Sequence, residues 1–121
     1  MMDSKSDKII PLKGEIWLAN LNPSKKSNEI GKVRPVLIFQ NDELNKSSYP
    51  TTIIIPLTTS LIDDAQPLRY RIDKKNNLNQ DSDLLIAHIR AIDNNRLINK
   101  ISELSNNDMN IIKKLLDEVL L

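Results

Sequence analysis

The chain has 121 residues, of which 40% are hydrophobic and 27% charged, and its formal net charge is +1. This length suits one domain rather than two independent cores, and the small net charge excludes the strongly basic composition of a sequence-independent nucleic-acid binder. With no cysteine and a single histidine, the chain has neither disulfides nor a thiolate or His-rich metal centre, so we expect no metal and no other cofactor.

The N-terminal region does not carry the marks of a signal or an anchor. Residues 1–8 are polar and charged, and the apolar run at 9–12 is too short for the apolar region of a secretory signal. No stretch approaches the roughly 20 apolar residues of a membrane span. We therefore expect a cytoplasmic protein with no membrane contact, made of a flexible N-terminal extension (1–12) and a single domain (13–121).

The first predicted strand is residues 13–21 (KGEIWLANL), in which both alternating sets of side chains are apolar. Such a strand is covered on both faces, so we expect Trp17 in the core rather than stacked on a ligand. Residues 22–32 (NPSKKSNEIGK) then form a polar loop of a length typical of functional loops. The next strand, 33–40 (VRPVLIFQ), must begin at an edge or a strand start, because Pro35 cannot donate a ladder hydrogen bond.

The middle of the chain continues the strand pattern. Residues 41–50 (NDELNKSSYP) indicate a turn, and 51–57 (TTIIIPL) is a β-branched run typical of a central strand. Residues 68–72 (LRYRI) alternate, which predicts Leu68, Tyr70 and Ile72 facing inward and the two arginines outward.

The C-terminal third predicts two more strands and a helix. After a polar loop at 74–82, residues 84–92 (LLIAHIRAI) indicate one buried strand, and 97–103 is expected to be a strand after a turn at 93–96. Apolar residues from Met109 to Val119 recur at helical spacing, and Ser105 fits the N-cap. Strands followed by one helix predict an α+β domain in which the helix covers a curled antiparallel sheet or small barrel.

Three segments, GEIWLANLNP (14–23), EIGKVRPVLI (29–38) and IPLTTS (55–60), together with IRAID (89–93), resemble in order and spacing the MazF/PemK toxin family. The resemblance covers nearly everything from Lys13 onward. It implies an SH3-like barrel that forms a homodimer, cleaves single-stranded RNA at short sequence motifs without a metal, and is held inactive by a cognate MazE-like antitoxin. It places the family's catalytic arginine on Arg34, its catalytic threonine on Thr58 and an upstream acidic residue on Glu29.

These residue types suit cleavage of RNA by its own 2′-hydroxyl. A guanidinium holds two phosphate oxygens and stays cationic, so Arg34 is favoured as a clamp on the developing charge, with the general-acid role implied by the resemblance kept open. Glu29 would accept the 2′-hydroxyl proton or instead hold Arg34 by a bidentate pair. Thr58 would orient an oxygen by one hydrogen bond, and an alignment error of one residue would move this role to Thr59.

Other residues are candidates for contact with RNA. Three lysines crowd the loop before Arg34 and would either steer phosphate or form an ordinary solvated loop. For His88, a half-buried and hydrogen-bonded position is favoured over contact with a base. Thr59 and Ser60 would be ordinary turn residues unless they contact RNA. The full set of RNA-binding candidates is Lys25, Lys26, Lys32, Thr59, Ser60, Arg69, His88 and Arg90.

Two other functions remain open for this chain. One is a non-enzymatic toxin that binds and poisons a topoisomerase, as in the structurally related CcdB family, although the chain ends EVLL without the C-terminal aromatic contact of that family. The other is a binding module with the same barrel and no activity. An antitoxin partner would be a small protein whose disordered segment folds onto the RNA groove.

Overall fold

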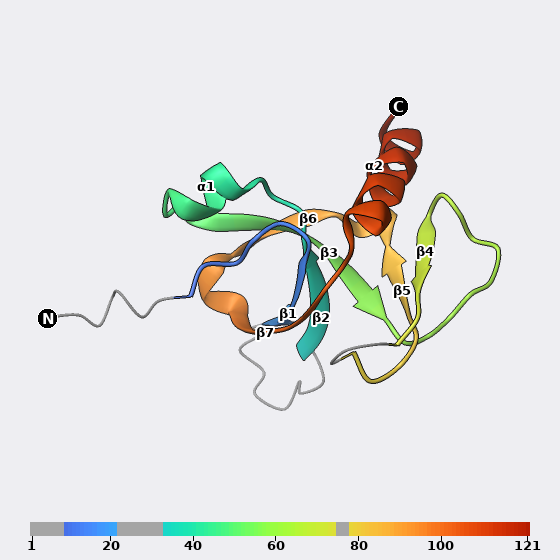
Figure 1. Cartoon of the computed structure of the whole chain (residues 1–121), viewed down its shortest axis with the longest axis horizontal. Helices are drawn as coiled ribbons and strands as arrows, with labels where there is room; N and C mark the ends of the chain where they lie inside the picture. The colour runs from blue at the N-terminus through green and yellow to red at the C-terminus, as the bar shows by residue number, and fades with distance from the viewer. Residues whose placement is uncertain (1–8, 22–32, 75–77) are drawn as a thin grey trace, which may run out of the picture.

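The structure is a computed structural model, and it describes residues 9–21, 33–74 and 78–121 (Figure 1). All the described strands lie before residue 104, and the longest helix follows them. The elements in chain order are β1 (Glu15–Asn20), β2 (Val33–Ile38), α1 (Asp42–Lys46), β3 (Thr51–Thr58), β4 (Arg69–Ile72), β5 (Ser82–Leu85), the 3-10 turn η2 (Ile86–His88), β6 (Arg90–Asp93), the 3-10 turn η3 (Asn94–Arg96), β7 (Leu97–Glu103) and α2 (Asn106–Leu120).

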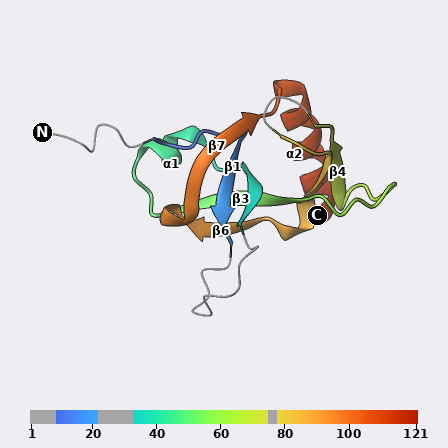
Figure 2. The same ribbon diagram turned by 90° about the horizontal axis from the view of Figure 1, so that it is seen from below.

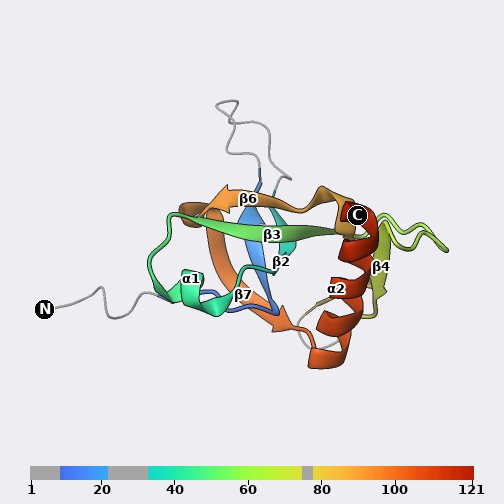
Figure 3. The ribbon, with the colours of Figure 1, turned by 90° about the horizontal axis from the view of Figure 1, so that it is seen from above.

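The strands form one curled antiparallel sheet in the order β4-β5-β3-β2-β1-β7, with β6 paired to β3. Strand β3 pairs with β2 along one edge, while its other edge is shared between β6 and β5. The views from below and above show β7 and β6 wrapping around β1, β2 and β3 (Figures 2 and 3). No pairing between β7 and β6 closes the described part of the sheet. The predicted α+β class, with a curled antiparallel sheet and a C-terminal helix, is confirmed.

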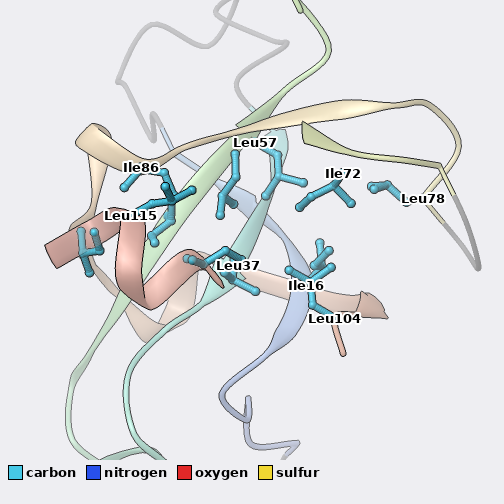
Figure 4. Close-up of a cluster of buried hydrophobic side chains, with 12 residues drawn as sticks. Ile16, Leu37, Leu57, Ile72, Leu78, Ile86, Leu104 and Leu115 are labelled. Atoms are coloured by element: carbon cyan, nitrogen blue, oxygen red, sulfur yellow. The ribbon is translucent and has the colours of Figure 1, made fainter. Parts of the chain in front are cut away.

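Two apolar clusters lie on opposite faces of this sheet. The first, which we call the helix-side cluster, contains Ile112, Leu115 and Leu116 of α2 together with sheet residues (Figure 4). The second, the inner cluster, is enclosed by the curl of the sheet and consists of Trp17, Ala19, Val36, Ile38, Ile54 and Ile92. Because successive side chains of a strand point to opposite faces, the sheet itself separates the two clusters.

Strand β1 shows why both alternating sets had to be apolar. Ile16 enters the helix-side cluster, whereas Trp17 and Ala19 enter the inner cluster, so β1 is covered on both faces as predicted. Trp17 is 4% exposed, which confirms its core position. Pro35 pairs with Leu18 of β1, in the part of β2 that precedes the register with β3, where its missing N–H interrupts no pairing with β3.

The prediction of a turn over residues 41–50 was incomplete. Residues Asp42–Lys46 form the short helix α1, which begins after Asn41, whose side chain accepts a hydrogen bond from the amide of Leu44 (2.9 Å). Asn45, buried in this helix, accepts a hydrogen bond from Gln40 (2.9 Å). The Asn41 N-cap and the hydrogen bond between Gln40 and Asn45 therefore stabilise a short helix in a segment rich in turn-forming residues.

Two other expectations were wrong. The run at 84–92 is not one strand, because η2 separates β5 from β6; Ile86 is buried and Ile89 packs against the helix-side cluster although the backbone turns between them. In the run 68–72, Tyr70 and Ile72 face the helix-side cluster as predicted, but Leu68, also expected inward, is 56% exposed, and the arginines on the other face are half-buried rather than open to solvent. Apolar composition alone therefore indicated burial of this region but not the path of its backbone.

Helix α2 begins as predicted. The hydroxyl of Ser105 accepts a hydrogen bond from the amide of Asp108 (3.1 Å), which is the expected N-cap. The hydroxyl of Tyr70 in β4 donates to the Asp108 carboxylate (2.7 Å), so the first turn of the helix is tied to the far end of the sheet. Within the described residues, no helix is long and apolar enough to cross a membrane.

The tie between Tyr70 and Asp108 predicts an alkaline titration. Burial and the hydrogen bond to Asp108 raise the pKa of Tyr70 to about 12. A raised pKa of the folded chain contributes stability that is complete below the ordinary tyrosine value of about 10 and is lost as pH rises toward 12. In a Tyr49→Phe chain, which leaves Tyr70 as the one tyrosine, phenolate absorbance should rise with a midpoint near pH 12, and Asp108→Asn should lower that midpoint. A midpoint near 10 in the folded chain would contradict the contact.

Candidate active site

Arg34 and Thr58 lie at neighbouring ends of β2 and β3. In the pairing of β2 with β3, the pair nearest the site is Val36 with Pro56; Arg34 and Thr58 each lie two residues beyond this pair, at positions that would face each other if the register continued. Residues opposite each other in an antiparallel pair point to the same face. That face carries Val36 and Ile54, so both candidates lie beyond the end of the inner cluster, on the side of the sheet away from α2.

The Arg34 side chain is exposed and makes no hydrogen bond or ion pair with the other residues that the structure describes. Its strand is held on the β1 side by the pairs Ala19 with Arg34 and Asn20 with Val33. The backbone of Arg34 is therefore fixed by the sheet, while no described residue occupies its guanidinium, a group that binds anionic ligands well.

Arg90 joins the same face from β6. It pairs with Ile54, and its Nη2 donates to the carbonyl oxygen of Leu21 (3.0 Å), directly after β1. Ile92, two residues further along β6, lies in the inner cluster, so alternation places Arg90 on the face of Arg34 and Thr58. Three strands thus contribute two arginines and one hydroxyl to one rim of the curled sheet.

The Thr58 hydroxyl oxygen accepts a hydrogen bond from the amide of Ser60 (3.1 Å). Accepting this bond leaves the O–H of Thr58 able to donate to a ligand. Thr59 and Ser60 are exposed, as expected of residues that follow a strand. Of the three hydroxyls, that of Thr58 is the one at the end of a paired strand, opposite Asp83 of β5.

Asp83 is the charged residue buried next to this site. It is 1% exposed and binds Arg71 through Oδ1 (2.5 Å) and Arg69 through Oδ2 (3.0 Å), and it accepts a hydrogen bond from the amide of Ile62 (2.9 Å). Burial by itself would raise the pKa of this carboxyl, but the hydrogen bonds from Arg71, Ile62 and Arg69 outweigh burial and hold the pKa below its usual value. Asp83 is therefore ionised at neutral pH.

Asp83 and its two arginines line an open cleft of about 740 Å³ with the segment 62–66. Sequence reasoning missed Asp83, because acidic residues ahead of an apolar run, here Asp81 and Asp83, have no distinctive pattern. One signal was available: two arginines spaced as in RYR on a strand require a negative partner if that strand is half-buried.

Of the remaining predicted residues, the structure describes His88 and Arg69. His88 lies at the end of η2 and is exposed, so the expected half-buried position was wrong; the cause is the turn that takes the place of a continuous strand. Arg69 is engaged with Asp83 and with the carbonyl of Ser60 (2.8 Å). Four candidates, Lys25, Lys26, Glu29 and Lys32, lie outside the described residues.

No group of three or more His, Asp or Glu side chains that would hold a metal occurs in the part of the chain that the structure covers. Beside the buried Asp83 carboxylate, the described residues contribute guanidinium groups and hydroxyls to the candidate site. Such groups bind and orient a phosphodiester and stabilise negative charge that develops on it.

Residues 12–120 match the family model of the PemK-like, MazF-like toxin of type II toxin–antitoxin systems. The chain belongs to this family. It is 38% identical over 107 residues to the endoribonuclease MazF of Staphylococcus saprophyticus, with 87% of each chain covered.

Solved structures share the fold at lower identity. MazF of Deinococcus radiodurans superposes with a TM-score of 0.74 at 18% identity and covers 93% of this chain and 98% of its own. The Mycobacterium tuberculosis toxin MazF-mt6 gives 0.72 at 21% identity, with coverage of 88% and 95%. An endoribonuclease from a mycobacterial species, solved in complex with its cognate antitoxin, gives 0.71 at 20% identity, with coverage of 91% and 94%.

The ion pairs of Asp83 predict a dependence of stability on acid. A lowered pKa in the folded chain contributes stability that is present above the ordinary aspartate value of about 4 and is lost as pH falls below it. Asp83→Asn should reduce the free energy of unfolding at pH 7 by about 3 kcal/mol, because two arginines lose their shared partner. Urea unfolding of both chains from pH 7 to pH 3 checks this, and the difference should shrink with acid. A constant difference over that range would exclude the charge as its cause.

Proposed function

We propose that this toxin is an endoribonuclease that cleaves single-stranded RNA at short sequence motifs without a metal. The observation that carries the proposal is the juxtaposition of Arg34 and Thr58 at adjoining strand ends, on an open face of the sheet. The name of the Staphylococcus saprophyticus relative, an endoribonuclease at 38% identity, supports the same activity.

In the reaction we propose, the 2′-hydroxyl oxygen of the substrate attacks the adjacent phosphorus and the bond from phosphorus to the 5′-oxygen breaks. The products are a 2′,3′-cyclic phosphate and a 5′-hydroxyl. The 2′-hydroxyl proton passes to a base, for which Glu29 is the candidate, and the leaving 5′-oxygen takes up a proton from water. No covalent bond to the protein forms.

Arg34 acts in this scheme as a clamp on the two non-bridging phosphate oxygens, where negative charge builds up in the transition state. A guanidinium stays cationic and is a weak proton donor near neutral pH, which favours the clamp over the general acid. The Thr58 O–H donates to one oxygen of the reacting group. Arg90 on the same face, with Thr59, Ser60, His88 and the lysines Lys25, Lys26 and Lys32, contacts neighbouring nucleotides.

We also propose the partners of this toxin. A second copy of the chain would form a homodimer, and a MazE-like antitoxin would cover the RNA site, as supported by the antitoxin complexes solved for a mycobacterial species and for Deinococcus radiodurans. The cytoplasm, where mRNA is available, is the proposed location. Residues 13–121 are proposed to act as one domain, with 1–12 as an extension.

The decisive test is cleavage of a defined single-stranded RNA by the purified chain in the presence of EDTA. Cleavage should persist in EDTA and fall about 100- to 1,000-fold in Arg34→Ala, because one preorganised donor to the developing charge is removed. Lys114→Ala, which removes one exposed charge from α2 on the opposite face, is the matched control and should leave the rate unchanged. Intact RNA with the unmodified chain would overturn the proposal and favour a toxin that binds a protein target.

A pair of substitutions tests which hydroxyl takes part. Thr58→Val keeps the shape of the side chain and removes its O–H, so the cleavage rate should fall about tenfold, equivalent to about 1.4 kcal/mol, the value of one hydrogen bond. Thr59→Val should change the rate less than twofold. The reverse order would move the catalytic hydroxyl by one residue.

A further inference from the structure

We infer that Arg69 is a positioning residue for the Thr58 hydroxyl, acting through the backbone of Ser60 and anchored by the buried Asp83. This inference rests on the proposed function, since it assigns a role within the same site. It also replaces the direct contact with RNA that was predicted for Arg69.

The first step is the bridge that Arg69 makes. Its Nη1 atom donates both to the carbonyl oxygen of Ser60 (2.8 Å) and to Oδ2 of Asp83 (3.0 Å). One nitrogen thus ties the segment after β3 to a carboxylate of β5. The side chain of Arg69 is 20% exposed and that of Asp83 is 1% exposed, so the bridge is shielded from water on the Asp83 side.

The second step leads from Ser60 to Thr58. The amide of Ser60 donates to the Thr58 hydroxyl oxygen (3.1 Å), while the carbonyl of the same residue accepts from Arg69. Fixing the carbonyl of Ser60 therefore fixes the residue whose amide meets the threonine oxygen. With one lone pair occupied, the Thr58 hydroxyl is restricted in rotation and its proton is directed away from Ser60.

The third step is the anchor. Asp83 pairs directly with Thr58 across β3 and β5, and it pairs with Arg71 across β5 and β4. Its Oδ2 atom also accepts a hydrogen bond from the amide of Ile62 (2.9 Å). The segment 60–62 is consequently held at two backbone points, at the Ser60 carbonyl by Arg69 and at the Ile62 amide by Asp83.

Arg71 supplies a matched comparison. It also binds Asp83, but its other partner is Asp63 (3.0 Å), whose side chain is 81% exposed, and not the Ser60 carbonyl. Removing either arginine takes one positive charge and one ion pair from the same carboxylate. Only the removal of Arg69 also releases Ser60.

The test is a double-mutant cycle on RNA cleavage in EDTA, with substitutions Arg69→Met and Thr58→Val and with Arg71→Met as the control. Arg69→Met should lower kcat about five- to tenfold and leave KM and the salt dependence of binding unchanged. In the Thr58→Val background, Arg69→Met should have no further effect on kcat, since both changes disable the same hydroxyl. Arg71→Met should keep kcat within twofold. Circular dichroism checks that each variant is folded.

Three results would overturn the inference. A raised KM with a smaller salt slope and an unchanged kcat would mean that Arg69 contacts phosphate directly. Effects of Arg69→Met and Thr58→Val that multiply would separate the two residues, and an equal fall of kcat in Arg71→Met would point to a general structural role. Should Arg69→Met not fold, Arg69→Gln, which is too short to reach Ser60, takes its place. Failure of the unmodified chain to cleave RNA would overturn the proposed function instead.

Discussion

The fold depends on the double pairing of β3. One edge of this strand pairs with β2, and the other is divided between β6 near its start and β5 at its end. A strand held on both edges has little freedom to shift its register, because a shift of one residue would exchange its buried faces. The position of Thr58 beside both Asp83 and the end of β2 follows from this constraint. Backbone pairing of β3 therefore determines where the candidate site lies.

Much of this architecture could be predicted, because several segments have strong periodic patterns. Strand β1 was identified because both alternating sets of its side chains are apolar, and β3 because it is a β-branched run. Helical spacing of apolar residues after a capping serine identified α2. Arg34 and Thr58 were singled out by resemblance to a family, since an arginine before a proline and a threonine after a strand are ordinary surface residues by themselves. The structure adds that both lie on one face.

The contacts around Asp83 could not be predicted for a physical reason. Its partners Arg69 and Arg71 lie 14 and 12 residues away, on a neighbouring strand, and their meeting depends on the register of β4 against β5. The sequence also did not reveal that η2 interrupts the apolar run 84–92. Ile86 and Ile89 remain in one cluster on either side of the turn, so burial continues where the strand does not.

The division of the interior into two clusters has a consequence for how unfolding would be observed. Trp17, the single tryptophan of the chain, belongs to the inner cluster, while the longest helix packs on the other side of the sheet. Indole fluorescence therefore reports the environment enclosed by the curl, and helical ellipticity reports the opposite layer. Coincident curves from the two signals would indicate that both layers melt as one cooperative unit, and separated curves would reveal a partly folded state that keeps only one of them.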